Sequence, residues 1–530
     1  MKVKAFLLLA VIAIILLGCK DSGNNLLDGQ IIKNDESEEI VKHIAVPILN
    51  YRTLNPILSK DESTFQMNHL IYDSLIDIDE SLIAVPSLAK NWRYSDDDRT
   101  LFLYLEEDVK WHDGNDFKAE DVVFTIYGIL NSSGNSSQYY SFIKNIQSAE
   151  KIDNHTVKIT FKTAYDNAIE NFTFPILSHA LYNSYKDVAK AVENYVPIGT
   201  GPYVVSAIEK SKNIQLVKNE NYWGEQVPIN DITLEIVPSL EDSIGLLEIH
   251  DIQMTVSRQS DWNKYLQNKG LFIKDFVSNE VEVLGFNHNN ALLSSRDVRQ
   301  AIAYAIDTGE IIDSIYLGSA IESDTPYRPH YLGANDVEGH YEKDLKKSRE
   351  LLNNAGFSHM NEDGYLLDEK GKIIKLNILT NYENTKRMDT AEIIKKHLKS
   401  AGIAAEINYI NYDQFSNRIS KGQYDMYLGG FAFSHVMDLR FILSSKLDNP
   451  TNYKNDYLDH LLVEMQRHLP LEKKQENFKE VRDILVADLP FYTLLYKKDA
   501  IIADKNMKGD IHPNFINLYE GIESWYIENK

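Results

Sequence analysis

The order of hydrophobic and polar residues along the chain predicts helices and strands in alternation. Three segments have apolar residues at the three- and four-residue spacing of a helix that buries one face, namely 297–306, 345–355 and 458–465. Gly356 is placed to end the second of these in a left-handed turn. Short β-like runs cover 373–379 and 403–410. The pattern favours a mixed α/β fold.

The chain opens with two lysines in its first four residues, followed by an uncharged apolar run over 5–17. This run is shorter than the ~20 residues that cross a bilayer, and it fits the hydrophobic region of a secretory signal. It ends in Leu16-Leu17-Gly18-Cys19, which resembles the bacterial lipobox. We therefore expect residues 1–18 to be a lipoprotein signal peptide and Cys19 to carry lipid. An ordinary signal peptide with a chance cysteine is the alternative, although this only cysteine of the chain has no partner for an internal disulfide.

Residues 19–40 are mainly polar and are predicted to form a flexible tether. A diacylglyceryl group supplies the two acyl chains that stable anchoring needs. No later run is apolar for long enough to span a membrane. We expect the remaining chain to lie outside the cell, held at the outer face of the cytoplasmic membrane by lipidated Cys19 alone.

Length and charge narrow the function classes. A chain of 530 residues is longer than one ordinary domain, so two or more lobes are expected. The net charge is −23, and loss of the two lysines within residues 1–18 makes it −23 − 2 = −25. Such an acidic body should be repelled by nucleic acid and by anionic lipid. The charge could favour cationic ligands or serve solubility alone.

Four groups of motifs follow one another in a fixed order. They are Ile71-Tyr72-Asp73-Ser74-Leu75 with Val85-Pro86-Ser87-Leu88-Ala89; Trp111-His112-Asp113-Gly114 with Phe117-Lys118-Ala119-Glu120-Asp121; Pro197-Ile198-Gly199-Thr200-Gly201-Pro202-Tyr203; and Phe286-Asn287 with Asp297-Val298-Arg299-Gln300-Ala301. Together they resemble the bacterial extracellular solute-binding proteins of family 5, which include oligopeptide- and dipeptide-binding lipoproteins of ABC importers. The resemblance covers nearly the whole mature chain.

Two of these motifs have a structural and a functional interpretation. Trp111-His112-Asp113-Gly114 could suggest a catalytic pair, but a polar turn that ends in Gly114 before a helix is what folding alone would require. Gly199-Thr200-Gly201-Pro202 is not a phosphate loop, because it lacks the Gly-Lys-Ser/Thr ending and Pro202 has no N–H to donate. We interpret both motifs as structural turns.

The resemblance implies a two-lobed fold of the type II periplasmic-binding-protein kind, with the ligand in a cleft between the lobes. It places one lobe at 41–285 plus 496–530, with an extra subdomain at about 84–195, and the other at 286–495. The chain would cross between lobes near 286–289 and 490–496. Hinge closure would trap the ligand, and a monomeric binding protein of this kind would deliver it to membrane permease subunits driven by a separate ATPase.

The resemblance also points to a ligand-contacting loop in the second lobe. Its candidate residues are Gly430, Phe431, Ala432, Phe433, Ser434 and His435. Phe431 stands where the family usually has Trp, and Ser434 or His435 stands where it has the Asp that pairs with a ligand amine. Because a buried ammonium needs a counter-charge, either Asp438 takes that role or the ligand lacks a free amine. His435 is either a ligand contact or an ordinary loop histidine.

Five further candidates come from segments that line the cleft in the family. Tyr51 and Arg52 precede Leu54-Asn55-Pro56, and Asn381, Tyr382 and Arg387 follow a predicted strand. The planar fork of Arg387 suits a ligand carboxylate. Each of the five could equally be a solvated loop residue.

The sequence lacks the marks of an enzyme. Neither Gly-x-Ser-x-Gly nor His-Glu-x-x-His occurs, so a secreted hydrolase is the weaker hypothesis, and no cofactor or bound metal is expected. Peptides lead as the ligand, followed by a metal–chelator complex of the nickel type and an oligosaccharide. A receptor that presents its ligand to a signalling system would have the same binding chemistry.

Overall fold

The computed structural model describes residues 42–132, 137–192, 195–334 and 341–528. All of them belong to one compact unit that runs from Ile40 to Lys530. The predicted signal peptide, Cys19 and the tether lie outside the described residues. Within these ranges, no helix is both long enough and apolar enough to cross a membrane.

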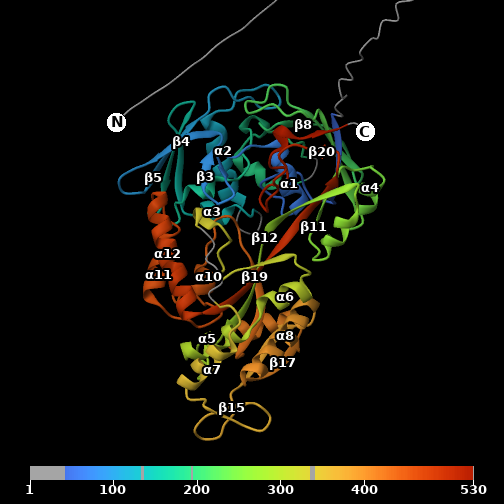
Figure 1. Ribbon diagram of the computed structural model, residues 1–530. Coiled ribbons are helices and arrows are strands. Elements are labelled where there is room, and N and C mark those ends of the chain that lie inside the picture. The colour runs from blue at the N-terminus through green and yellow to red at the C-terminus, as the bar shows by residue number, and fades with distance from the viewer. Residues whose placement is uncertain (1–41, 133–136, 193–194, 335–340, 529–530) are drawn as a thin grey trace, which may run out of the picture. The chain divides into compact units, whose positions relative to one another are not determined.

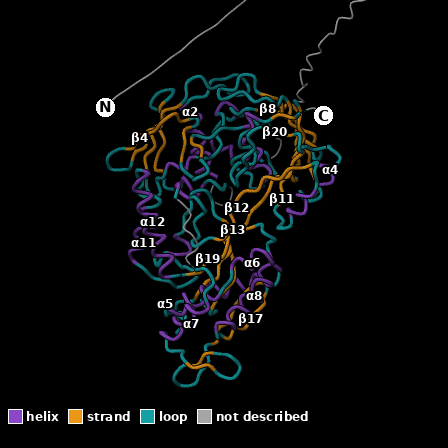
Figure 2. Tube along the Cα trace, viewed as in Figure 1, coloured by secondary structure: helices purple, strands orange, loops and turns teal. Residues whose placement is uncertain are grey.

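Helices and strands alternate along the chain, as the hydrophobic pattern predicts (Figures 1 and 2). The α-helices are α1 (Glu62–Ile71), α2 (Ala119–Ser132), α3 (Tyr140–Ile143), α4 (Ile244–Glu248), α5 (Arg296–Ala305), α6 (Thr308–Ile315), α7 (Leu345–Asn354), α8 (Thr385–Ala401), α9 (Tyr412–Ser420), α10 (Arg440–Leu443), α11 (Asp456–Glu464) and α12 (Leu471–Asp488). The mixed α/β class expected from the sequence is confirmed.

Two four-stranded sheets are built from the first half of the chain. One has the order β1-β10-β9-β8, with β1 (His43–Leu49), β10 (Asp231–Val237), β9 (Asn213–Lys218) and β8 (Tyr203–Glu209). The other has the order β4-β5-β7-β6, with β4 (Ala89–Tyr94), β5 (Thr100–Leu105), β7 (Thr156–Phe161) and β6 (Ile146–Lys151). The second sheet and α2 fall within the predicted extra subdomain, whose bounds stay a prediction.

A seven-stranded sheet is built mainly from the second half of the chain. Its order is β11-β19-β12-β18-β16-β17, and β13 pairs with β19. The strands are β11 (Met254–Ser257), β19 (Phe491–Asp504), β12 (Leu271–Phe286), β18 (Met426–Ala432), β16 (Lys375–Asn381), β17 (Ala404–Ile410) and β13 (Ala320–Glu322). Short two-stranded sheets are formed by β2 (Ile76–Ile78) with β3 (Ala84–Pro86), β14 (His359–Met360) with β15 (Leu366–Leu367), and β20 (Met507–Lys508) with β21 (Tyr526–Ile527).

The two longest strands, β12 and β19, pair antiparallel along most of their length. Their register shifts between Val277 and Val281, where β12 carries a bulge. One hydrophobic core cluster draws its residues from 44–276 and 501–527, and another draws them only from 284–495. The strands β12 and β19 contribute to both clusters, so they connect the two cores (Figure 1).

The predicted elements occur close to their expected positions. The helix expected over 297–306 is α5, and the one expected over 345–355 is α7, after which Gly356 has a φ of +93°. The β-like runs at 373–379 and 403–410 correspond to β16 and β17. These assignments are confirmed, with boundary shifts of a few residues.

The two motifs interpreted as turns contact each other. His112 Nδ1 accepts a hydrogen bond from the Gly199 N–H at 3.2 Å, and its Nε2 lies 3.0 Å from the Gly201 carbonyl oxygen. Gly199 and Gly201 also pass so close to the end of α1 that a Cβ on Gly199 would lie 1.8 Å from the Ile71 oxygen. Both ring nitrogens of His112 are used, and burial lowers its pKa. The structural interpretation therefore accounts for this histidine.

Candidate functional site

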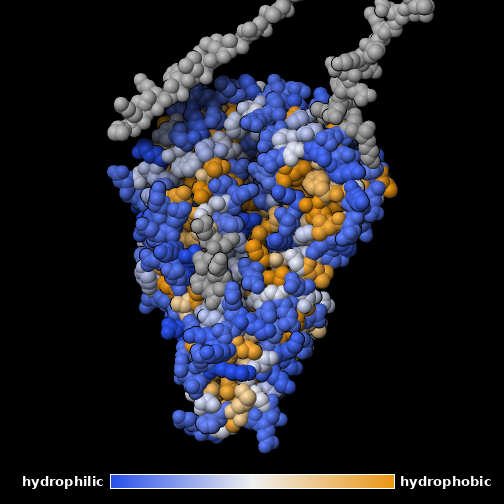
Figure 3. All heavy atoms as spheres, in the orientation of Figure 1, coloured by the Kyte–Doolittle hydropathy of each residue, from blue (hydrophilic) through white to orange (hydrophobic). Residues whose placement is uncertain are grey.

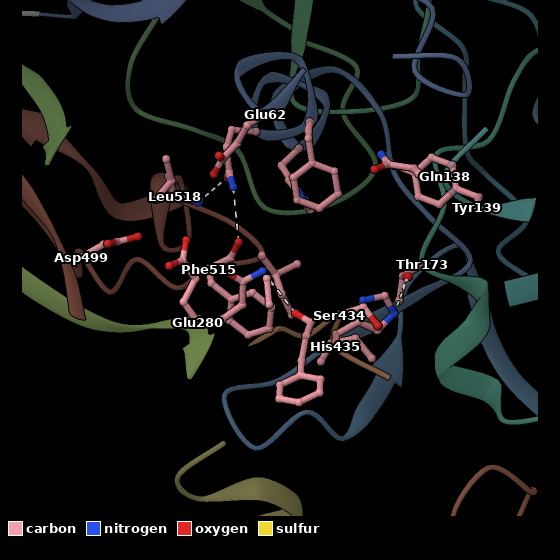
Figure 4. A pocket seen from close by; sticks show the side chains of 18 of the residues that line it. Glu62, Gln138, Tyr139, Thr173, Glu280, Ser434, His435, Asp499, Phe515 and Leu518 are labelled. Carbon is pink, nitrogen blue, oxygen red and sulfur yellow. Dashed lines mark hydrogen bonds between the residues drawn. The ribbon is translucent and has the colours of Figure 1, made fainter. Parts of the chain in front are cut away.

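A cavity of about 410 Å³ lies among segments that are far apart in the sequence (Figure 4). One wall comes from α1, β2 and the start of α3, and the opposite wall comes from the end of β18 and the loop after it. Phe276, Asn279 and Glu280 of β12 and Asp499 of β19 close it between these walls. The volume lies in the range of ~300–1,000 Å³ that is typical of small-molecule sites.

Aromatic side chains dominate the apolar part of the cavity. They are Phe65, Tyr139, Phe142, Phe276, Phe433 and Phe515. The ring of Phe142 lies edge-on to the ring of His435, with 5.3 Å between centroids. Rings of this kind bury a large apolar area at little cost in side-chain entropy. The cavity therefore suits a ligand that carries an apolar or aromatic group.

The molecular face in Figure 3 is mostly hydrophilic, with hydrophobic residues gathered in a few patches.

The predicted ligand loop contributes four residues, 432–435, to the wall. Strand β18 pairs with β12, so that Ala432 lies opposite Glu280. Beyond the paired strands, the Phe433 N–H donates to the Asn279 oxygen at 3.0 Å, and Asn279 Nδ2 donates to the Phe433 oxygen at 3.2 Å. These bonds fix the start of the loop against β12 and turn Ser434 and His435 toward the cavity (Figure 4).

His435 also contacts the opposite part of the chain. Its Nε2 lies 2.9 Å from Thr173 Oγ1 (Figure 4) and 2.9 Å from the main-chain oxygen of Glu170. Burial lowers the pKa of the imidazole, against an opposing effect of the Glu170 carbonyl and of the charges of Glu170 and Asp77. The ring is therefore neutral near pH 7.

Four carboxylates line the cavity, and they differ in their partners. Glu62 pairs with Arg258, and Glu280 pairs with Lys497 at 2.6 Å. Asp499 lies 4.0 Å from Arg258, and burial raises its pKa to about 6. Asp77 is exposed to the cavity, and none of the described lysine, arginine or histidine nitrogens lies within 4 Å of its carboxylate. Asp77 is therefore the carboxylate with the most capacity for a cationic ligand group.

Three of the predicted residues line a second cavity of about 480 Å³, namely Gly430, Phe431 and Arg387. Arg387 forms a two-pronged pair with Glu282, with Nε 2.7 Å from Oε2 and Nη2 3.1 Å from Oε1. Glu282 is only 3% exposed, so this pair is internal to the protein. A Cβ on Gly430 would lie 2.6 Å from Arg387 Nη2 and 2.6 Å from the Val281 oxygen, which explains the glycine at this position.

The remaining candidates line neither cavity. Asp438 accepts three hydrogen bonds from Arg440, one from the main-chain N–H at 3.0 Å and two from the guanidinium at 2.9 and 2.7 Å, and Arg440 also contacts Asp166 at 2.6 Å. The Arg52 N–H donates to Asp61 at 3.0 Å, and Tyr51 packs on the first core cluster.

Asn381 is buried and donates to Glu383 at 3.0 Å, whereas Tyr382 is 52% exposed. The structure thus brings 432–435 together with the cavity and leaves Tyr51, Arg52, Asn381 and Tyr382 elsewhere.

The sequence did not reveal the contributions of α1, β12 and β19 to the cavity. Nor did it single out Lys386, which lines an adjoining cavity of about 360 Å³ that shares Arg258, Glu280 and Asp499 with the first. Lys386 Nζ contacts Ser260 Oγ, and none of the described carboxylates lies within 4 Å of it. Burial lowers its pKa. An unpaired lysine here offers a site for an anionic group of a ligand.

Within the described ranges, no group of three or more His, Cys, Asp and Glu residues is arranged to hold a metal ion.

Comparison with known proteins agrees with this geometry. The oligopeptide-binding protein AppA of Bacillus subtilis is 26% identical over 98% of this chain and 97% of its own length. The nickel-binding periplasmic protein of Escherichia coli is 24% identical over 69% of this chain and 70% of its own length. The structure of HbpA2 from Haemophilus parasuis has a TM-score of 0.79 at 19% identity, covering 92% of this chain and all of that chain. The family model for the middle part of the bacterial extracellular solute-binding proteins, family 5, matches residues 84–452. The chain, with its two-lobed mixed α/β fold, therefore belongs to the bacterial extracellular solute-binding proteins of family 5.

Proposed function

We propose that this protein captures short extracellular peptides in the cavity between α1 and the loop 432–435, and hands them to the permease of an ABC importer. The observation that carries the proposal is the make-up of the cavity. Its aromatic lining suits apolar side chains, the unpaired Asp77 suits an amine, and the adjoining Lys386 suits a carboxylate. A peptide has these three groups in one molecule. The oligopeptide-binding name of the Bacillus relative supports the same ligand class.

The capture step follows from the way the cavity is assembled. We place one lobe at 41–285 plus 496–530 and the other at 286–495, so that β12 and β19 are the strands that connect them. A ligand that contacts both walls stabilises the closed arrangement over the open one, and this difference shifts the population toward closure. The permease would then recognise the closed form. No catalytic step is needed, and we expect the protein to be a binder and not an enzyme.

We further propose that Cys19 is lipidated, that residues 19–40 form the tether, and that the body acts as a monomer at the outer face of the cytoplasmic membrane. This rests on the lipobox resemblance and on the extracellular character of the family. Mass spectrometry of the protein from cells would show a diacylglyceryl mass on the mature chain. Replacement of Cys19 by Ala should release the protein from the membrane fraction.

A metal–chelator complex is the second candidate. It is favoured by the presence of both His69 and His435 in the cavity wall and by the nickel-binding relative. In that case the chelator would supply most of the metal's donors.

Native mass spectrometry of the soluble body from Asp21 onward separates the two candidates. A ladder of added masses that matches short peptides would support peptide capture. A single added mass with a metal isotope pattern would overturn it in favour of the chelate. Isothermal titration with defined tripeptides would then measure affinity and test whether both termini contribute.

A further inference from the structure

The hydrogen bonds of His435 determine which of its ring nitrogens carries the proton. Nε2 lies 2.9 Å from the main-chain oxygen of Glu170 and 2.9 Å from Thr173 Oγ1. A carbonyl oxygen can only accept, so Nε2 must be the donor, with its proton shared between the two oxygens. The burial that lowers the pKa of this ring keeps it neutral. A neutral ring with a proton on Nε2 has a free lone pair on Nδ1.

The Nδ1 lone pair of His435 lies at the cavity wall. Among the described residues, Nδ1 of His435 has no hydrogen-bond partner, while the ring itself lines the cavity. The edge contact with Phe142 fixes the plane of the ring. Three protein neighbours, Glu170, Thr173 and Phe142, therefore fix the direction of the Nδ1 acceptor.

The charges that act on the ring come from Glu170 and Asp77. The carboxylate of Glu170 is engaged by Lys474 Nζ at 2.6 Å, in a pair whose side chains are 12% and 8% exposed. Asp77 lines the cavity and has no cation within 4 Å among the described residues. Asp77 therefore supplies the negative charge that a neutral histidine cannot.

We propose that Nδ1 of His435 accepts a hydrogen bond from the amino group of the bound peptide, with Asp77 as its counter-charge. The inference rests on the proposed peptide function and names the residues that recognise one end of the ligand. His435 and Asp77 would together bind an amino group that a single carboxylate could also bind. A peptide with a blocked amino group would lose the attraction of Asp77 and two of its three donors.

The same bonds couple recognition to closure. Glu170 and Thr173 lie in the proposed first lobe, and His435 lies in the second. Only when these segments meet does Nε2 have its two acceptors, which fix the proton there and leave Nδ1 free. Peptide binding and the contact between the lobes therefore stabilise the same tautomer of His435. This contributes to cooperativity between binding and closure.

The test compares a tripeptide that has a central phenylalanine, with its amino terminus free or acetylated, by isothermal titration. The wild-type protein should bind the free form at least about tenfold more tightly, a difference of about 1.4 kcal/mol. His435→Gln keeps a donor near the Nε2 position but loses the Nδ1 acceptor, and it should reduce this ratio several-fold. Asp77→Asn should reduce it as well. His359→Gln is the matched control, because this exposed histidine lies on β14 and does not line the cavity.

The outcomes separate the inference from the function on which it rests. Equal binding of both forms by the wild type, or an unchanged ratio in both variants, would overturn the inference and leave peptide capture intact. Binding of neither form would overturn peptide capture and the inference with it. Nitrogen NMR of the His435 ring gives a second readout, since Nδ1 should be unprotonated in the closed protein, where Glu170 and Thr173 hold the Nε2 proton, and its resonance should shift when the peptide amine binds to it. A protonated Nδ1 in the free closed protein would contradict the assignment.

Discussion

Replacement of Arg387 by Met tests whether this arginine serves the ligand or the fold. The change removes both bonds to Glu282, which are 2.7 and 3.1 Å long, and leaves a carboxylate that is only 3% exposed. Breaking a buried ion pair by removing one partner costs roughly 3–5 kcal/mol. Lys497 Nζ remains 3.3 Å from Glu282, so we expect the lower end of this range, about 3 kcal/mol.

The assay is urea unfolding of the ligand-free protein, together with titration of the tripeptide. Arg387→Met should lower the free energy of unfolding and change the peptide affinity little. Adding Glu282→Gln to this variant should restore most of the stability, because the buried charge is then gone. Lys90→Met is the control, since it removes an exposed pair with Glu107 and should leave the unfolding free energy unchanged within error. If Arg387→Met instead kept its stability and lost affinity, Arg387 would be a ligand contact and this reasoning would be refuted.

Three further results are expected. Peptide affinity should fall as the pH drops below the ordinary histidine pKa of ~6.5, by up to about tenfold per pH unit, because burial of the His435 ring in the closed form lowers its pKa, whereas the open, ligand-free form takes up the proton. A flat titration profile over pH 5–8 would contradict this. Lys386→Met should abolish most of the preference for a free over an amidated carboxyl terminus, about tenfold by titration, and a preference that survives would place the carboxylate elsewhere. Gly430→Ala should lower the melting temperature, because its Cβ would lie 2.6 Å from the Val281 oxygen, and a wild-type melting temperature would show that β12 can yield there.

Much of the fold could be predicted from local patterns. Helix α5 shows its buried face in the spacing of its apolar residues, and the turn motifs at His112 and Gly199 could be identified as structural before their contacts were known. Such features depend on neighbours within a few residues, or on a motif order that the whole family shares. The candidate loop 430–435 was predicted from the family resemblance, and residues 432–435 of it line the cavity.

The rest of the site depends on pairings that the sequence does not display. Asp499 enters the cavity because β19 pairs with β12 in a register that places it opposite Phe276. Arg387 was predicted to bind a ligand carboxylate, and in the structure its guanidinium binds the carboxylate of Glu282, which lies 105 residues away on β12. The partner of Arg387 depends on the tertiary contact between helix α8 and strand β12, which the sequence does not display.

The bulge in β12 has a mechanical consequence. Three residues of β12, 278–280, lie between positions that pair with Lys498 and Tyr496, so the two strands are locally out of step. Two of these three, Asn279 and Glu280, form part of the cavity wall. When one end of the strand pair twists relative to the other, the twist should be concentrated at this bulge, because the two strands are out of register there. A ligand that contacts the bulge should make it more rigid. Slower hydrogen exchange of the amides of 278–280 on binding would report that change directly.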